Sequence, residues 1–318
     1  MQCVATPEHL TADAAGAPLE PALDKLLNRQ AGPVTLLLHG YKYCPFHQPS
    51  AADPTLRDPH RLIYAETPET TCDRIISWPG MLDRAGPTLG IGWPGMHTGH
   101  GTLNSIRGFA EVYARADSIA RQVARLADRI AALDPDRRID LIGHSLGGRI
   151  ALASLPHMKL AEPGRILLWG AAERATIARM HIERGTGRTE IINIRARTNA
   201  PFDRMFEWAA PGQGPALGAA GPVDGVATLT LDDPRTEQAL QARGLPLGAT
   251  SRGRCHWSFY TRPGTGPLYA ALLDQPGIWT ADRIAALSDE PAPAQQTSRN
   301  AVVSTLSALL PTNRMRGA

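Results

Sequence analysis

Apolar residues follow two patterns along this chain: short continuous runs, and one long stretch in which they recur at three- and four-residue steps. The long stretch covers residues 104–133, and arginine and aspartate fill its opposite face. Asp134 and Pro135 follow it directly, and a proline at this point stops a helix. The pattern therefore predicts a long amphipathic helix that lies across a sheet.

The short apolar runs have the length and composition of buried strands. They cover residues 33–41, 89–95, 139–142, 165–170, 190–196 and 226–231. Segments with helical character separate or follow them, at residues 171–182, 202–209 and 268–273. Strands that alternate with helices require right-handed crossovers, so we predict an α/β fold whose mostly parallel sheet is covered on both faces.

We divide the chain into three parts. Residues 1–30 are rich in Ala and Pro, with one short helical stretch at 19–28, and we expect a loosely ordered N-terminal segment. Residues 31–285 form a single domain, in which the Pro-, Gly-, Trp- and His-rich stretch 42–103 is a long loop region at the substrate rim. Residues 286–318 form a C-terminal tail, with a possible short helix at 301–310.

Composition narrows the class of protein. The 318 residues are 43% hydrophobic and 20% charged, which is typical of a globular chain. The net charge of +3 comes without a basic run interleaved with aromatic residues, so we expect no nucleic-acid partner. The four cysteines are widely spaced, which disfavours a disulfide framework and a zinc site. The sequence has neither a signal-peptide pattern nor an apolar run of about 20 residues, so we expect a cytoplasmic protein without a membrane span.

The strongest chemical motif follows the run at 139–142. Gly143, Ser145 and Gly147 have the spacing G-x-S-x-G, and small apolar residues of helical character come next. A strand, a sharp turn and a helix would expose the Ser145 hydroxyl as a nucleophile. A phosphate-binding loop starting at Gly143 is the competing interpretation, but it would require Lys and then Ser or Thr at the positions of Arg149 and Ile150.

A serine nucleophile needs a base and an orienting acid, which follow in the order Ser, acid, His in this architecture. Of the later histidines, His157 ends the helix after Ser145 and His181 precedes the strand at 190–196, which leaves His256. The first acid after that strand is Asp203, which would alternatively serve only to stabilise the first turn of a short helix. The other candidate acids are Glu207, Asp232 and Asp233.

Two backbone N–H groups are the expected oxyanion donors. One belongs to Leu146, directly after the nucleophile, and the other to Tyr41, which follows the strand that ends in His39 and Gly40. A further group of histidines lies in the loop region, at His47, His60, His97 and His100. No cysteine or paired carboxylate stands beside them at ligand spacing, so we predict solvated loop histidines, with no metal and no cofactor.

With the runs 36–41 and 143–148, together with Asp203 and His256, the chain resembles the α/β-hydrolase superfamily, and most closely its serine esterases and lipase-like members. The resemblance covers about residues 33–275. It implies Ser145 as nucleophile, His256 as base and Asp203 as acid. The early loop departs from the His-Gly-Gly-Gly form of some esterases, and the 42–103 segment is longer than in the simplest members.

The resulting expectation is a serine hydrolase that cleaves a small-molecule carboxylic ester through an acyl-enzyme intermediate. An acyltransferase or an amide or thioester hydrolase would use the same three residues. A binding protein of this fold without catalytic activity is the alternative from a different class, since one fold hosts many functions.

Overall fold

The computed structural model describes residues 1–46, 57–97, 102–185, 187–250 and 253–288. An eight-stranded sheet forms its middle, in the order β2-β1-β4-β3-β5-β6-β7-β8. Only the β1–β2 pair is antiparallel among these strands, so the predicted α/β class with a mostly parallel sheet is confirmed. The strands are β1 (Gln2–Ala5), β2 (Leu10–Thr11), β3 (Val34–Leu38), β4 (Thr88–Gly92), β5 (Ile139–His144), β6 (Arg165–Trp169), β7 (Glu190–Arg195) and β8 (Val226–Thr230).

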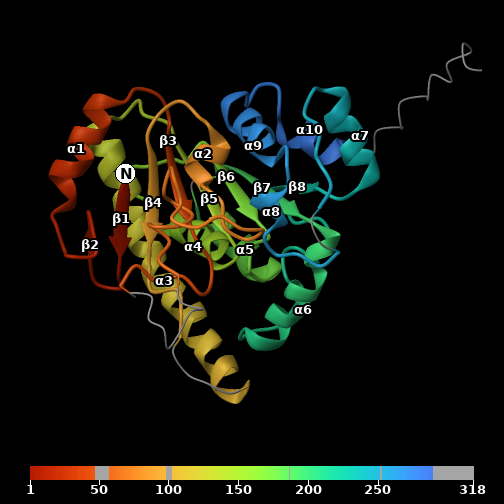
Figure 1. The fold of residues 1–318 in the computed structure, drawn as a ribbon, viewed down its shortest axis with the longest axis horizontal. Coiled ribbons are helices and arrows are strands. Elements are labelled where there is room, and N and C mark those ends of the chain that lie inside the picture. The colour runs from red at the N-terminus through yellow and green to blue at the C-terminus, as the bar shows by residue number, and fades with distance from the viewer. Residues whose placement is uncertain (47–56, 98–101, 186, 251–252, 289–318) are drawn as a thin grey trace, which may run out of the picture.

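Helices cover both faces of the sheet (Figure 1). One face packs against α1 (Leu19–Arg29), α3 (Thr102–Leu133), α4 (Leu146–Ser154), α5 (Ala175–Glu183) and α6 (Ala200–Ala209). The other packs against α2 (Trp78–Leu82), α7 (Pro234–Ala242), α8 (Ser258–Thr261), α9 (Thr265–Asp274) and α10 (Ala281–Ala286). Two short 3₁₀ turns, η1 (Leu155–His157) and η2 (Arg197–Asn199), follow α4 and β7. The 32-residue helix α3 has the C-terminal end that its periodicity predicts.

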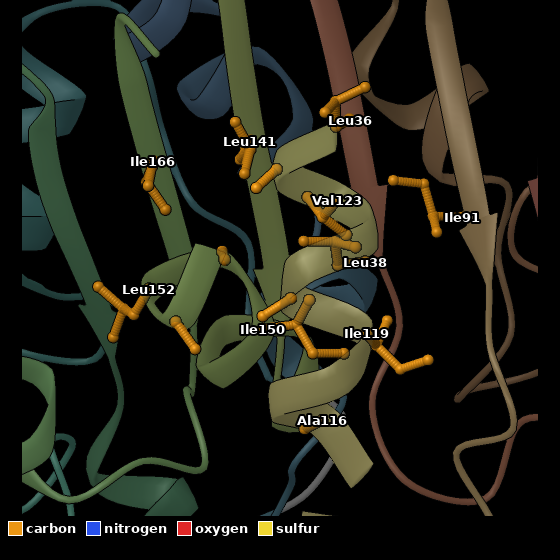
Figure 2. Close-up of a cluster of buried hydrophobic side chains, with 14 of the residues drawn as sticks. Leu36, Leu38, Ile91, Ala116, Ile119, Val123, Leu141, Ile150, Leu152 and Ile166 are labelled. Carbon is orange, nitrogen blue, oxygen red and sulfur yellow. The ribbon is translucent and has the colours of Figure 1, made fainter. Parts of the chain in front are cut away.

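Side chains of the strands alternate between the two faces, as the period of a strand requires. Leu36 and Leu38 of β3 contact the cluster that includes Ile119 and Val123 of α3, whereas Leu37 lies on the opposite face (Figure 2). All of these residues are fully buried. Each side chain of this size stabilises the fold by roughly 1.5–3 kcal/mol through burial alone, which explains why continuous apolar runs form the strands.

The second face carries a cluster of aromatic rings. Trp78 at the start of α2 lies edge-on to Trp169 of β6, with ring centroids 5.2 Å apart. Trp169 in turn stacks on Tyr269 of α9 at 4.8 Å. Offset and edge-to-face pairs of this kind add to the free energy of burial. They attach α2 and α9 to the sheet behind the end of β5.

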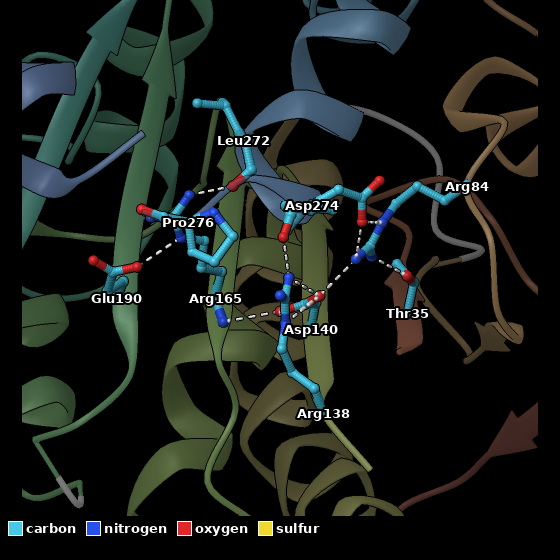
Figure 3. A network of polar contacts seen from close by, with 10 residues as sticks. Thr35, Arg84, Arg138, Asp140, Arg165, Glu190, Leu272, Asp274 and Pro276 are labelled. Carbon is cyan, nitrogen blue, oxygen red and sulfur yellow. Dashed lines mark hydrogen bonds and ion pairs between the residues drawn. The ribbon is translucent and has the colours of Figure 1, made fainter. Parts of the chain in front are cut away.

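A buried group of charges lies at the amino end of the central strands. Asp140 of β5 is fully buried and accepts hydrogen bonds from the guanidinium groups of Arg84 (3.0 Å) and Arg138 (2.8 Å). Its other oxygen accepts from the backbone N–H of Arg165 at 3.1 Å. We call these four residues the Asp140 cluster (Figure 3). The Arg165 guanidinium also donates to three carbonyl groups of the segment from Leu272 to Trp279, so the cluster ties the end of α9 to the sheet.

The N-terminal segment differs from the expected loose order. Residues 2–5 form β1, which pairs in parallel with β4, and residues 19–29 form α1. Cys3, Val4 and Ala5 are buried. A short run of small apolar residues can therefore form a strand when it pairs with the edge of a neighbouring strand. The predicted loop region 42–103 likewise contains α2 and β4, of which only the strand was expected.

Three helices near the end of the described chain, α7, α8 and α10, were not predicted. Asp233 and Thr280 cap α7 and α10, because their side chains accept hydrogen bonds from backbone N–H groups in the first turn. The possible helix at 301–310 lies outside the described residues. In the part of the chain that the structure describes, no helix has the length and apolar character needed to cross a bilayer.

Candidate active site

Ser145 lies in a strained turn at the carboxyl end of β5. Its backbone has φ 55° and ψ −121°, which residues other than glycine rarely adopt. The Ser145 N–H donates to the Trp169 carbonyl at 3.0 Å, and its own carbonyl accepts from the N–H groups of Gly148 and Ala172 at 3.0 and 2.9 Å. Strand, turn and helix therefore have the arrangement that the G-x-S-x-G motif predicts.

The two motif glycines are required by close packing. A side chain at Gly143 would collide with the backbone of Gly147, and one at Gly147 would collide with the carbonyl oxygen of Leu38. The helix thus approaches β3 and β5 more closely than any residue with a Cβ atom allows. This approach keeps the amino end of α4 beside Ser145, where its unpaired N–H groups can stabilise negative charge.

The segment after β3 lies against Ser145. A methyl group placed on Gly40 would lie 3.2 Å from Ser145 Oγ and 2.7 Å from its Cβ. His39 holds this segment, because its Nδ1–H donates to the Gly40 carbonyl at 2.8 Å and its Nε2 accepts from Trp93 N–H at 3.0 Å. Burial lowers the pKa of His39 to about 3, so it stays neutral and keeps both bonds at neutral pH. Tyr41 follows Gly40 directly, so its backbone N–H belongs to the segment that borders Ser145.

Replacing Gly40 with alanine is expected to displace the Ser145 side chain by a fraction of an ångström or more, so any activity that depends on this hydroxyl should fall by about 100-fold in kcat. Steady-state ester hydrolysis measures the change. Gly221→Ala is the matched control, since nothing lies within 4 Å of a methyl group there. Equal activity of the two variants would show that Gly40 does not border the reacting atoms.

His256 lies beside the elbow, in the loop before α8. Its ring is 4.5 Å from that of His144, the residue immediately before Ser145, and stacks on Phe202 at 4.9 Å. His144 Nε2–H donates to the His256 carbonyl at 2.9 Å, so the strand that leads into Ser145 also holds the loop that carries His256. Burial, and then the neighbouring His144, hold the pKa of His256 well below its usual value, which leaves the ring neutral and able to accept a proton.

Asp203 does not contact the imidazole of His256 directly. Asn199 lies between them: its Oδ1 is 2.7 Å from His256 Nδ1, and its Nδ2 donates to Asp203 Oδ1 at 3.0 Å. The reason is that η2 brings Asn199 to the end of β7, while Asp203 lies one helical turn further along α6. Asn199 was not predicted because it is not an acid. The sequence feature that could have indicated it is an amide acceptor soon after the strand that precedes Asp203.

The other candidate acids have separate structural roles. Glu207 accepts from the N–H of Ala216 at 2.7 Å, and Asp233 caps α7. Asp232 accepts from the backbone N–H groups of Arg197 and Thr198 at 2.8 and 2.9 Å. Asp232 therefore shapes the turn that presents Asn199.

Aromatic side chains from three segments gather near the elbow. Tyr41 lies edge-on to Phe109 of α3 at 5.3 Å, and Phe109 lies edge-on to Phe206 of α6 at 6.3 Å. Phe202 of α6 covers one face of the His256 ring. We call Tyr41, Phe109, Phe202 and Phe206 the aromatic rim. Phe206 is buried, whereas Tyr41, Phe109 and Phe202 are half-buried and keep part of their apolar surface exposed.

The histidines of the loop region do not gather into a metal site in the part of the chain that the structure describes. His60 packs against Tyr64 with ring centroids 5.7 Å apart, and His97 Nδ1 lies 3.4 Å from Glu111. His47 and His100 lie outside the described residues.

The sheet, its crossovers and the serine elbow define the α/β-hydrolase type of fold, which confirms the predicted fold resemblance. Among solved structures, TT1662 from Thermus thermophilus is 14% identical with a TM-score of 0.40, over 77% of this chain and 89% of that one. MenH from S. aureus is 10% identical with a TM-score of 0.37, over 76% and 94%. A lipase-esterase related protein from Clostridium acetobutylicum ATCC 824 is 12% identical with a TM-score of 0.35, over 76% and 94%. No protein-family model and no curated protein matches the sequence.

Proposed function

We propose that this protein is a serine hydrolase that cleaves a small-molecule carboxylic ester through an acyl-enzyme intermediate. The observation that carries the proposal is the backbone of Ser145, with φ 55° and ψ −121°, at the carboxyl end of β5. Strained backbone conformations of this kind cluster at functional sites. Here it turns the hydroxyl away from the sheet, toward the segment of Gly40 and Tyr41.

The mechanism follows from the groups around this hydroxyl. Ser145 Oγ attacks the ester carbonyl while His256 Nε2 takes the hydroxyl proton, and the tetrahedral oxyanion accepts hydrogen bonds from the N–H groups of Leu146 and Tyr41. The intermediate collapses when His256 returns the proton to the leaving alkoxide. A water molecule, deprotonated by His256, then attacks the acyl-enzyme. When the second tetrahedral intermediate collapses, His256 returns this proton to Ser145 Oγ, which releases the acid and free Ser145.

The aromatic rim favours a neutral acyl chain over a charged one, because burying a charge beside apolar rings is costly. A series of p-nitrophenyl esters of increasing acyl length tests this specificity. We expect kcat/KM to rise by about threefold for each added methylene until the rim is filled. A preference for a charged acyl group would contradict the assignment of the substrate.

A fluorophosphonate probe tests the nucleophile independently of the substrate. We expect one adduct, located by mass spectrometry on the peptide that contains Ser145, and none in Ser145→Ala. If both proteins react equally little, the chain is a binding member of its fold. Faster release of p-nitrophenol and a new ester product when an alcohol is added would instead indicate an acyltransferase.

A further inference from the structure

Three polar side chains form a line that starts at His256. The His256 Nδ1 atom lies 2.7 Å from Asn199 Oδ1, and Asn199 Nδ2 lies 3.0 Å from Asp203 Oδ1. Asn199 is 2% exposed and Asp203 6%, so solvent hardly competes for these bonds. Both carboxylate oxygens of Asp203 lie against Gly218, where a methyl group would meet them at 2.9 Å. The line is therefore enclosed by packed backbone.

The ionised carboxylate of Asp203 determines how the Asn199 amide is oriented, and the amide in turn determines which nitrogen of His256 carries the proton. An ionised carboxylate can only accept, so Asp203 must face the NH₂ group of the Asn199 amide. The amide oxygen then faces His256, and an oxygen without a hydrogen requires a proton on Nδ1. Nε2 is thereby left with its lone pair, which is the form of imidazole that a general base needs.

We propose that Asn199, and not Asp203, is the residue that holds His256, and that Asp203 acts through Asn199 as a second positioning residue. The proposal rests on the proposed function in one respect, namely that His256 is the base. It replaces the expected Ser145, His256 and Asp203 triad by a line of four residues in which a neutral amide separates the imidazole from the carboxylate.

The separation changes how charge reaches the imidazolium that forms during the reaction. A carboxylate in direct contact stabilises that cation strongly, whereas here the amide contributes a dipole and the negative charge lies one residue further away. The charged groups that face Asp203 are Glu207 on its own helix and Arg195 on β7. His144 lies on the far side of His256, and burial lowers its pKa to about 4, so it adds no charge at neutral pH.

The rate of the reaction should therefore depend on whether the Asp203 carboxyl group is ionised. Burial raises its pKa to about 6, and the charge of Glu207 adds to the rise, while the Asn199 hydrogen bond and Arg195 oppose it. Below this pH the carboxyl group is protonated and can donate as well as accept, so the amide is no longer held in one orientation. Activity is expected to rise with pH through about 6.

The first test compares Asn199→Ala with Asp203→Asn in ester hydrolysis across pH. Asn199→Ala is expected to lower kcat by about 100-fold through loss of the Nδ1–H tautomer. Asp203→Asn is expected to lower it by only about tenfold, because an amide oxygen can still accept from Asn199. The rise near pH 6 should disappear in Asp203→Asn and persist in the control Asp224→Asn, which removes an exposed carboxylate.

The double variant Asn199→Asp with Asp203→Asn reverses the order of amide and carboxylate. It should recover at least tenfold of the activity lost in Asn199→Ala, and it should raise the pKa of His256, because a carboxylate then contacts the imidazole. A loss of several orders of magnitude in Asp203→Asn, with only a few-fold loss in Asn199→Ala, would overturn the proposal in favour of direct contact by Asp203.

The tautomer is measured without turnover, by ¹⁵N NMR of histidine-labelled protein that carries Ser145→Ala. We expect Nδ1–H in this protein, and a mixture of tautomers once Asn199→Ala is added. An unchanged spectrum would overturn the proposal even if the protein hydrolyses no ester, whereas the expected spectrum with an inactive protein would reject only the proposed function. Asp203→Asn should remain folded, and above pH 6 it should gain stability relative to the parent, because a carboxyl group with a raised pKa destabilises the fold as it ionises.

Discussion

Replacing Ser145 with alanine is expected to abolish ester turnover, with a loss on the order of 10⁶-fold in kcat, while the fold stays intact. The hydroxyl is the bond-forming group in the proposed reaction, and no donor or acceptor nearby can take its place. The backbone of residue 145 carries the same strain with either side chain, since both have a Cβ atom. The free energy of unfolding should therefore change by less than about 0.5 kcal/mol.

Ser154→Ala is the matched control for this variant. Ser154 is fully buried and ends the helix that begins directly after Ser145, but its hydroxyl donates only to the Ala151 carbonyl at 2.7 Å. Full activity in Ser154→Ala, with none in Ser145→Ala, would assign the chemistry to Ser145. Residual activity above 1% of wild type in Ser145→Ala would identify another nucleophile.

Ser145→Gly separates strain from chemistry. Glycine adopts a positive φ without the cost of a Cβ atom, so this variant should be inactive and yet more stable by about 1 kcal/mol. Chemical denaturation of the three proteins with Ser, Ala and Gly at position 145 measures the difference. Lower stability of the glycine variant than of the alanine variant would show that the elbow stores no strain.

Asp140→Ala is expected to produce the largest loss of stability, about 3–5 kcal/mol. Removing this carboxylate leaves the buried guanidinium of Arg84 without one of its partners and removes the acceptor of the Arg165 N–H. The melting temperature should fall by roughly 10 °C. Asp140→Asn keeps the shape and part of the hydrogen bonding, so it should lie between the alanine variant and wild type.

Arg188→Ala is the comparison for Asp140→Ala. Arg188 forms its ion pair with Glu162 at the surface, where its side chain is 77% exposed. Pairs of this kind contribute at most about 1 kcal/mol, because water screens the charges. Similar losses of stability in the two variants would indicate that the buried ion pairs of the Asp140 cluster stabilise the fold no more than an exposed pair does. Catalytic activity at low temperature should survive in both.

The sheet and the strained turn at Ser145 could be predicted because local physics determines them. An apolar run such as residues 36–38 is stable only when it is buried, and glycines on both sides of Ser145 are needed wherever a strand and a helix approach so closely. The assignment of His256 depended on chain order, and the structure brings it beside His144. These features could be predicted because each depends on a few neighbouring residues or on the order of the strands, helices and motifs along the chain.

The contact between Asn199 and His256 could not be predicted in this way. It joins residues 57 positions apart, and its hydrogen bond depends on the turn that Asp232 holds through the backbone of Arg197 and Thr198. The strand at residues 2–5 is similar, because its few apolar residues become a strand only beside β4. In both cases the local structure depends on a residue or strand that is distant in the sequence, and the local propensity of the segment does not predict that partner.

The Asp140 cluster and Ser145 occupy opposite ends of the same strand, β5. Substitutions that reshape the aromatic rim leave the anchoring charges untouched, and so do insertions in the loops at the carboxyl ends of the strands. Laboratory evolution toward new acyl groups can therefore restrict its libraries to the residues at the carboxyl end of β5. Stabilising substitutions can first be introduced at the amino end, so that the protein tolerates the later changes.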